Sequence, residues 1–264
     1  MNEFKGKIIV VTGGANGIGR CIVEEFLSLH AFVAFMDIDE TAGKILAQKH
    51  GDNVLFVCGD VTKEGDLVRF SQEVIRKFGK VDYLINNACS GNGGILSQMG
   101  FDAFNQVLFS KITAPYTLTK LFMPHFGDGA TVVNIASTRA QQSQQDTESY
   151  TAANGGMVAL THALSVSLAN RVRVNAISPG WIDTTKYQSS TSVYEPSKED
   201  KLQHPVGRIG HPVDIFNMVK FLCSDASGFI TGQNFTVDGG MSKLMVYHGD
   251  EGWMLNESEI AEKM

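Results

Sequence analysis

The sequence contains few cysteines, no long apolar run and no dense cluster of lysine and arginine. Its four cysteines are scattered and form no Cys-x-x-Cys pair, which argues against disulfides and against a zinc site. The net charge of −6 argues against a nucleic-acid partner, and no apolar stretch has the length of a membrane span. The N-terminus also lacks the pattern of a signal peptide. We therefore expect a cytoplasmic protein that holds no metal and binds neither nucleic acid nor membrane.

What is present is typical of a globular α/β protein, with 43% hydrophobic and 19% charged residues in a chain of 264. Strand and helix patterns alternate, which predicts a doubly wound domain with a parallel sheet. The expected strands are residues 8–11, 32–36, 54–58, 83–85, 131–135, 172–177 and 234–237. The expected helices are residues 18–29, 40–50, 67–78, 101–125, 150–169 and 212–223. No linker interrupts this pattern, so we predict one domain over residues 1–241, with a polar lid at about 184–205 and an acidic extension at 242–264.

A glycine-rich turn, Thr12-Gly13-Gly14-Ala15-Asn16-Gly17-Ile18-Gly19, follows the first expected strand. Four β-branched residues precede it and an apolar-periodic helix follows it. Strand, glycine turn and helix in this order bring backbone N–H groups and the positive end of a helix to one place, which favours a phosphate. The spacing is Gly-x-x-x-Gly-x-Gly, and a glycine-rich turn alone could also be no more than a tight turn.

Two aspartates stand where a nucleotide would continue from this turn. Asp37 ends the second expected strand, 18 residues after Gly19, where a carboxylate accepts hydrogen bonds from both ribose hydroxyls and repels a 2′-phosphate. This position favours NAD over NADP, although the alternative is a solvated aspartate at a strand end. Asp60, which follows the third expected strand, could accept a hydrogen bond from an adenine amine or be an exposed turn residue.

Several further motifs combine with the glycine turn: Asn86-Asn87-Ala88, Ser137, Tyr150 and Ser178-Pro179-Gly180. Together they resemble the short-chain dehydrogenase/reductase family over about residues 5–241. The resemblance implies a Rossmann-type fold with a seven-stranded sheet, a nicotinamide cofactor and a homotetramer. It also implies the following cofactor-binding residues: Gly13, Asn16, Gly17, Ile18, Gly19, Asp37, Asp60, Val61, Asn87, Ala88, Tyr150, Pro179, Gly180, Ile182 and Thr184.

The same resemblance implies a tyrosine as acid/base, a serine that orients the substrate oxygen, a lysine four residues after the tyrosine and an asparagine in the preceding long helix. Tyr150 and Ser137 match the first two. The ordinary pKa of a tyrosine is about 10, so proton transfer near neutral pH needs a nearby cation. At about 4 Å and an effective dielectric constant of about 20, one positive charge contributes about 4 kcal/mol, or roughly three pKa units.

This sequence departs from the family pattern at that cation. Asn154 stands four residues after Tyr150, where the family has lysine, and Lys111 aligns with the family's asparagine. One interpretation is an exchange, in which Lys111 restores the positive charge and Asn154 takes the hydrogen-bonding role. The other is two unrelated departures, with Lys111 a solvated helix residue and the site weakened.

Two functions follow from these residues. The first is an NAD-dependent oxidoreductase that acts on a secondary alcohol or ketone, with Ser137, Tyr150, Lys111 and Asn154 in the catalytic site. The alternative is a nearly inactive NAD-binding family member with a binding or structural role, which Asn154 motivates. The sequence does not identify the substrate. In the acidic extension, Trp253 could anchor the tail on this or a neighbouring subunit.

Overall fold

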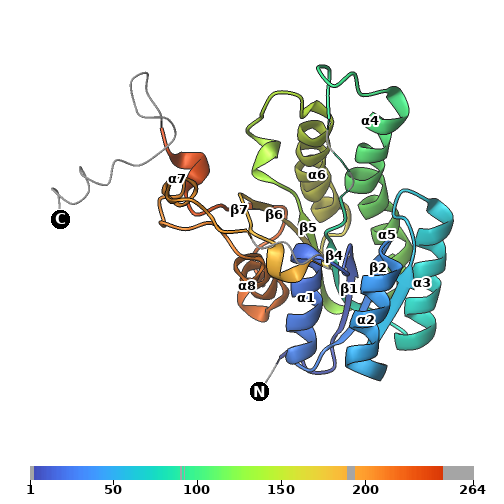
Figure 1. Ribbon diagram of the computed structural model, residues 1–264. Coiled ribbons are helices and arrows are strands. Elements are labelled where there is room, and N and C mark those ends of the chain that lie inside the picture. The colour runs from blue at the N-terminus through green and yellow to red at the C-terminus, as the bar shows by residue number, and fades with distance from the viewer. Residues whose placement is uncertain (1–2, 90, 92, 189–193, 246–264) are drawn as a thin grey trace.

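Runs of β-branched and aromatic residues form a sheet of seven parallel strands in the computed structural model, which describes residues 3–89, 91, 93–188 and 194–245 (Figure 1). The sheet order is β3-β2-β1-β4-β5-β6-β7. The bounds are β1 Ile8–Thr12, β2 Phe32–Asp37, β3 Val54–Cys58, β4 Val81–Asn86, β5 Phe126–Ile135, β6 Arg173–Pro179 and β7 Asn234–Val237. The expected α/β class and the seven-stranded parallel sheet are confirmed.

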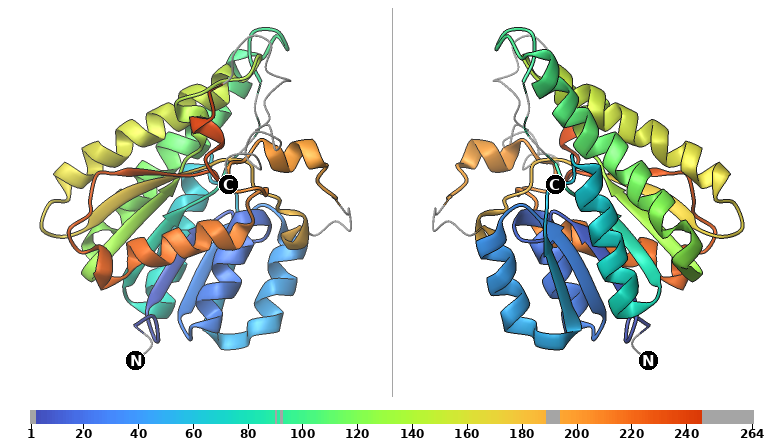
Figure 2. Two further views of the ribbon diagram at one scale, coloured as in Figure 1. Left: turned by 90° about the vertical axis from the view of Figure 1, so that its left-hand side faces the viewer. Right: turned by 90° about the vertical axis from the view of Figure 1, so that its right-hand side faces the viewer.

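Helices cover both faces of the sheet, as the two side views in Figure 2 show. One face carries α1 Gly17–Ser28, α2 Glu40–His50 and α8 Pro212–Cys223, and these helices share one hydrophobic core with the sheet. The other face carries α3 Glu64–Phe78, α5 Ala114–Phe122 and α6 Glu148–Ser167 over a second core, with α4 Phe101–Leu108 continuing the line of α5. Each strand is therefore buried from both sides, which explains its apolar sequence.

The strand order reverses between β1 and β4, which lie side by side at the centre of the sheet. β2 and β3 extend from β1 in one direction, and β5, β6 and β7 extend from β4 in the other. In open sheets of this kind, ligands bind outside the carboxyl ends of the strands at such a reversal. A ligand is therefore expected to bind beside the residues that follow Thr12 and Asn86.

The chain is helical over the whole of the predicted range 101–125, but it is not a regular α-helix throughout. A π-helical segment, Phe109–Thr113, separates α4 from α5, and a 3₁₀ turn ends the run at Met123–His125. Pro115 supplies the reason: it has no N–H to donate to the carbonyl of Lys111, and its ring crowds that carbonyl. The backbone widens by one residue in that turn, as π-segments in α-helices do.

The remaining boundaries differ by a few residues. β5 begins at Phe126 rather than at 131, because two glycines and an aspartate hide its first half. The expected irregular lid holds a 3₁₀ turn, Thr185–Tyr187, and the short helix α7, Lys198–Leu202, which a Ser197–Asp200 capping box starts.

The acidic extension begins with a 3₁₀ turn at Met241–Lys243, and the proposed anchor at Trp253 lies outside the described residues. Within the described ranges no helix has both the length and the apolar character of a membrane span.

Candidate active site

The glycine turn after β1 is formed by glycines that serve different purposes. Gly13 and Gly17 have φ angles of +66° and +59°, in the left-handed region that favours glycine. Gly19 lies in the first turn of α1 and has no room for a side chain, because an added Cβ would stand 1.9 Å from the Gly13 carbonyl oxygen. This close packing of α1 on the turn leaves the N-terminal end of α1 facing the carboxyl edge of the sheet, where a phosphate would bind.

A clamp between β1 and β4 fixes the turn from its other side. The side-chain amide of Asn87 donates to the carbonyl oxygens of Thr12 and Gly13, both at 3.0 Å. In return the Thr12 hydroxyl accepts the backbone N–H groups of Asn87 and Ala88 at 3.0 and 3.1 Å. These four bonds satisfy the strand-end backbone groups at the reversal of strand order, so the turn has a defined shape without a ligand.

Asp37 stands at the end of β2 with its carboxylate turned toward the glycine turn. Its Oδ2 accepts the backbone N–H of Ala15 at 2.9 Å, and its Oδ1 accepts that of Asp39 at 3.0 Å. Asp39 in turn accepts from the Asn16 side chain at 2.9 Å. The expected ribose acceptor and the expected phosphate turn are therefore neighbours.

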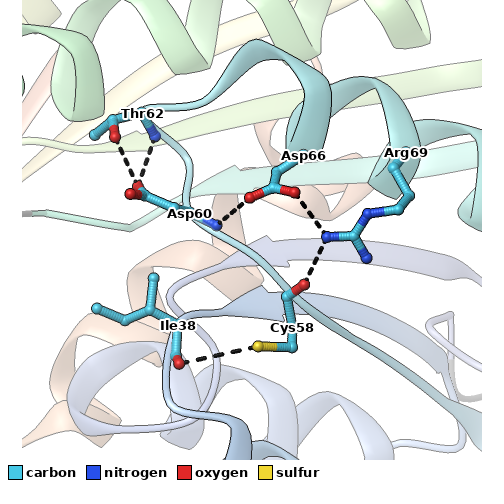
Figure 3. A network of polar contacts seen from close by, with 6 residues as sticks. All are labelled: Ile38, Cys58, Asp60, Thr62, Asp66 and Arg69. Atoms are coloured by element: carbon cyan, nitrogen blue, oxygen red, sulfur yellow. Dashed lines mark hydrogen bonds and ion pairs between the residues drawn. The ribbon is translucent and has the colours of Figure 1, made fainter.

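Asp60 organises the turn after β3 (Figure 3). Its Oδ1 accepts from both the backbone N–H and the hydroxyl of Thr62, at 2.9 and 2.8 Å. Its own backbone N–H donates to Asp66, which pairs with Arg69 at 2.8 Å. The Arg69 guanidinium and the Asp60 N–H hold the pKa of the Asp66 carboxyl below its ordinary value. This network fixes the edge of the sheet at which an adenine would lie.

Two expected cofactor residues pack partly into the protein. Ile18 lies against the core under α1, and Val61 lies against the core on the opposite face. Each leaves only part of its side chain for a ligand.

The loop after β6 reaches the glycine turn from the far half of the chain. Gly180 donates its N–H to the Val237 carbonyl at 3.0 Å, so the end of β6, with Pro179, is tied to β7. A Cβ added at Gly17 would be 3.7 Å from the Thr184 methyl, which places Thr184 beside the phosphate turn. Ile182 forms a bridge with Gly210. The expected cofactor residues of the glycine turn and those of the loop after β6 thus lie at the same edge of the sheet.

Ser137 and Tyr150 lie on adjacent elements at the same edge. Ser137 directly follows the last buried positions of β5, is 9% exposed, and accepts the N–H of Arg139 at 3.2 Å. Tyr150 is half-buried in the first turn of α6. Among the described residues no hydrogen bond joins the two hydroxyls, so the structure brings these elements together without pairing the side chains.

Lys111 is buried, with 2% of its surface exposed, and its ammonium donates to the Ile135 carbonyl at 2.7 Å. The interpretation of Lys111 as a solvated helix residue is therefore wrong. Ile135 ends β5 two residues before Ser137, so the ammonium stands at the strand end that carries the serine. Within the described chain, no carboxylate forms an ion pair with it. Burying an ammonium group that is hydrogen-bonded only to a neutral carbonyl costs desolvation free energy. A nearby negative or strongly accepting group would offset that cost.

Asn154 is fully buried on α6, one turn after Tyr150. Its amide Nδ2 donates to the Tyr150 carbonyl oxygen at 2.8 Å, while its Oδ1 has no hydrogen-bond partner among the described residues. The helix approaches the π-segment closely here, because a Cβ at Gly156 would stand 2.5 Å from Ile112 Cδ1. Asn154 and Lys111 thus belong to two packed segments, and Asn154 keeps a free acceptor.

A ladder of buried polar side chains, which the sequence did not predict, joins three elements near the candidate site. Asn86 donates to Asn134 at 2.8 Å, Asn134 donates to Thr161 at 2.9 Å, and Thr161 donates to the Met157 carbonyl at 2.8 Å. The ladder connects β4, β5 and α6, which precede Asn87, precede Ser137 and carry Tyr150 respectively. Polar residues inside otherwise apolar strands were the available indication.

Known proteins match this chain over most of its length. A family model described as enoyl-(acyl carrier protein) reductase matches residues 13–242. L-fucose dehydrogenase of Mus musculus is 36% identical over 247 residues, covering 91% of this chain and 90% of that protein. An apo SCOR enzyme from Clostridium thermocellum is 43% identical with a TM-score of 0.86, covering 95% and 98% of the two chains. Ligand-free aldohexose dehydrogenase of Thermoplasma acidophilum is 25% identical with a TM-score of 0.82, covering 94% and 98%.

Proposed function

The chain belongs to the short-chain dehydrogenase/reductase family, and from this premise we propose an NAD-dependent oxidoreductase that acts on a secondary alcohol or its ketone. The observation that carries the proposal is the buried ammonium of Lys111 at the strand end beside Ser137. It supplies, from the neighbouring helix, the positive charge that the asparagine at 154 lacks. The direct test is turnover of NADH with a panel of ketones and of NAD with the matching alcohols.

The residues present fit a nicotinamide dinucleotide. The left-handed glycines at 13 and 17 leave a cradle that side chains would fill, and the N-terminus of α1 faces it. Asp37 would bind the adenosine ribose, and the Pro179–Thr184 loop would contact the nicotinamide end. The bound cofactor would supply or accept the hydride.

The proton would be transferred by side chains of this protein. Tyr150 would give its hydroxyl proton to the carbonyl oxygen of a ketone, or take the proton from an alcohol. Ser137 would hold the same oxygen by a hydrogen bond. The Lys111 ammonium would stabilise the negative charge that develops on the reacting oxygens during proton transfer, because an opposite charge in a water-excluded site contributes several kcal/mol. The free Oδ1 of Asn154 would accept a hydrogen bond within this group.

A binding protein with little turnover is the second candidate, because Asn154, four residues after Tyr150, is a neutral amide. The two functions separate in a pair of measurements. Calorimetry with NADH establishes whether the cofactor binds, and the substrate panel establishes whether hydride transfer follows. Binding without turnover on any alcohol or ketone would favour the second candidate.

We further propose that the alcohol is one hydroxyl of a sugar. The similar proteins include an L-fucose dehydrogenase and an aldohexose dehydrogenase, and both names describe sugar substrates. Aldoses should therefore be part of the panel, beside simple ketones and secondary alcohols.

Cofactor choice is expected to depend on Asp37. In the unmodified protein NADH should bind at least about tenfold more tightly than NADPH, because the carboxylate repels a 2′-phosphate. Asp37→Ala should narrow that difference, whereas Asp52→Ala, an exposed aspartate on the turn before β3, should leave it unchanged. Fluorescence titration with both cofactors measures the ratio. Equal affinities in the unmodified protein would overturn the assignment.

We also propose a homotetramer, in which α4, α5 and α6 pair with the same helices of another copy. These helices expose large apolar side chains, among them Phe101 at 83%, Tyr116 at 49% and Val166 at 75%. Two small residues of these helices, Ala114 and Ala153, are buried within the protomer and lie outside the proposed contact.

A charge on this helical face is expected to break the assembly. Tyr116→Glu places a carboxylate in an apolar contact and should shift a tetramer to smaller species in light scattering at micromolar concentration. Ile45→Glu is the matched control, because Ile45 is 61% exposed on α2, away from this face. A monomeric unmodified protein would refute the proposal.

A further inference from the structure

The lid contains a buried histidine with one unused ring nitrogen. His204 follows α7, is 1% exposed, and has its Nδ1 at 3.0 Å from the Asp200 carbonyl oxygen. A carbonyl oxygen only accepts, so Nδ1 carries the proton and Nε2 of the neutral ring is an acceptor. Nε2 is buried and has no hydrogen-bond partner among the described residues. A buried acceptor left unpaired costs about 1–3 kcal/mol, so this nitrogen calls for a donor.

The residues around His204 connect it to the active site. Trp181, the residue after Gly180 of the cofactor loop, has its ring centre 6.2 Å from that of His204. A Cβ at Gly239 would lie 3.5 Å from both Cβ and Cδ2 of His204, so the segment after β7 packs against the histidine. That segment also approaches the turn after Ser137, where Gln142 donates to the Ser242 carbonyl at 3.4 Å. The lid, the cofactor loop and the serine turn therefore surround one region.

Trp181 has aromatic neighbours on two sides, because the ring of Tyr194 also lies 6.2 Å away. The Tyr194 hydroxyl donates to the Asp200 carboxylate at 2.8 Å, whereas the histidine ring contacts the Asp200 carbonyl oxygen. An apolar ring beside a lone polar acceptor suits a ligand that has apolar C–H groups and hydroxyl donors on the same small skeleton.

We propose that His204 Nε2 accepts a hydrogen bond from a non-reacting hydroxyl of a sugar substrate, while the Trp181 ring packs against the sugar's C–H groups. This inference rests on the proposed function and names the residue that selects its substrate. An acceptor of this kind discriminates strongly, because a substrate without the hydroxyl leaves the nitrogen unpaired. Histidine at this position determines specificity and takes no part in the transfer of the proton or hydride.

Two variants separate the two ring nitrogens. His204→Asn retains an N–H group near the Nδ1 position and loses the atom at Nε2. His204→Gln carries its amide out to the Nε2 position and loses the donor to Asp200. The measurement is kcat/KM on an aldose that the enzyme accepts and on each of its monodeoxy analogues, together with a simple ketone that has no other hydroxyl.

The unmodified enzyme should prefer the aldose over one of its deoxy analogues by about tenfold or more. In His204→Asn, kcat/KM on the aldose and on that deoxy analogue should become about equal, because KM for the aldose rises. The kcat/KM on the simple ketone should change by no more than about twofold. His204→Gln should keep most of the preference. Thermal unfolding of both variants checks that the lid segment remains folded. An equal loss on every substrate would assign His204 a structural role and overturn the proposal, as would unchanged discrimination in His204→Asn.

Other outcomes separate this inference from the function on which it rests. If simple ketones are reduced and no aldose is accepted, the specificity proposal fails and the oxidoreductase remains. If nothing turns over, the proposed function fails, and calorimetric titration of the aldose and its deoxy analogues into the NAD-loaded protein decides the binding role of His204. In that titration, absence of aldose binding, or equal binding by the unmodified protein and His204→Asn, overturns the proposal.

Discussion

Replacing Lys111 with methionine is expected to lower kcat/KM by about a thousandfold, comparable to the loss from Tyr150→Phe. The substitution keeps the buried stem and removes the charge. One positive charge about 4 Å from a developing negative charge contributes about 4 kcal/mol at an effective dielectric constant of about 20, which corresponds to about a thousandfold in rate. Steady-state kinetics on one accepted substrate measures kcat/KM for both variants.

The substitutions Lys111→Asn and Asn154→Lys, made singly and together, test the proposed exchange directly. Lys111→Asn alone should lose most of the activity, and Asn154→Lys alone should bring two cations to one tyrosine without simply improving the enzyme. The double variant should recover much of the activity that Lys111→Asn loses, because the effects of substitutions at two residues that act as one unit are not additive.

Lys120→Ala is the matched control for both experiments, because Lys120 is an exposed lysine on α5. A nearly silent Lys111→Met together with a strong gain from Asn154→Lys would contradict the exchange. That result would instead mean that the site is weakened and that a lysine at 154 repairs it.

Gly19→Ala should abolish measurable NADH binding and destabilise the protein by about 1–3 kcal/mol or more. The added Cβ would stand 1.9 Å from the Gly13 carbonyl oxygen and 2.6 Å from the Asn87 amide nitrogen. Both contacts belong to the clamp that shapes the phosphate turn, so α1 would have to withdraw from it. Denaturant unfolding measures the stability, and calorimetry measures the cofactor affinity.

Gly65→Ala provides the matched control, since it adds the same methyl group in the first turn of α3 with no atom within 4 Å. It should raise stability by about 0.5–1 kcal/mol because alanine favours the helix, and it should leave cofactor binding unchanged. Normal NADH binding by Gly19→Ala would mean that α1 is not held against the turn in the way described.

The elements with the strongest apolar patterns were predictable, and those whose shape depends on one special residue were not. β1 and β2 are buried on both faces, so their β-branched and aromatic runs indicated strands directly. The break between α4 and α5 depends on Pro115, whose effect falls four residues earlier at the Lys111 carbonyl. A periodic apolar pattern continues through this break and conceals it.

The candidate site was predictable where local sequence determines it. Asp37 and the glycine turn follow from a strand end and a tight turn. The burial of Lys111 had a usable indication as well, because it is spaced at four and three residues from Val107 and Ala114, which are both buried. His204 had none, since its burial depends on residues near 181 and 239 that only the fold brings together.

The order of the strands also affects the chain while it is being synthesised. β1 pairs with β2 soon after both are made, but its other partner, β4, follows much later, and the Ile8 N–H finds Asp82 only across 74 residues. Until then, one side of the Ile8–Thr12 strand, which is fully buried in the folded protein, is an open edge. An apolar edge of this kind recruits other chains. We therefore expect this edge of β1 to be an aggregation-prone surface of the nascent chain until β4 has been synthesised.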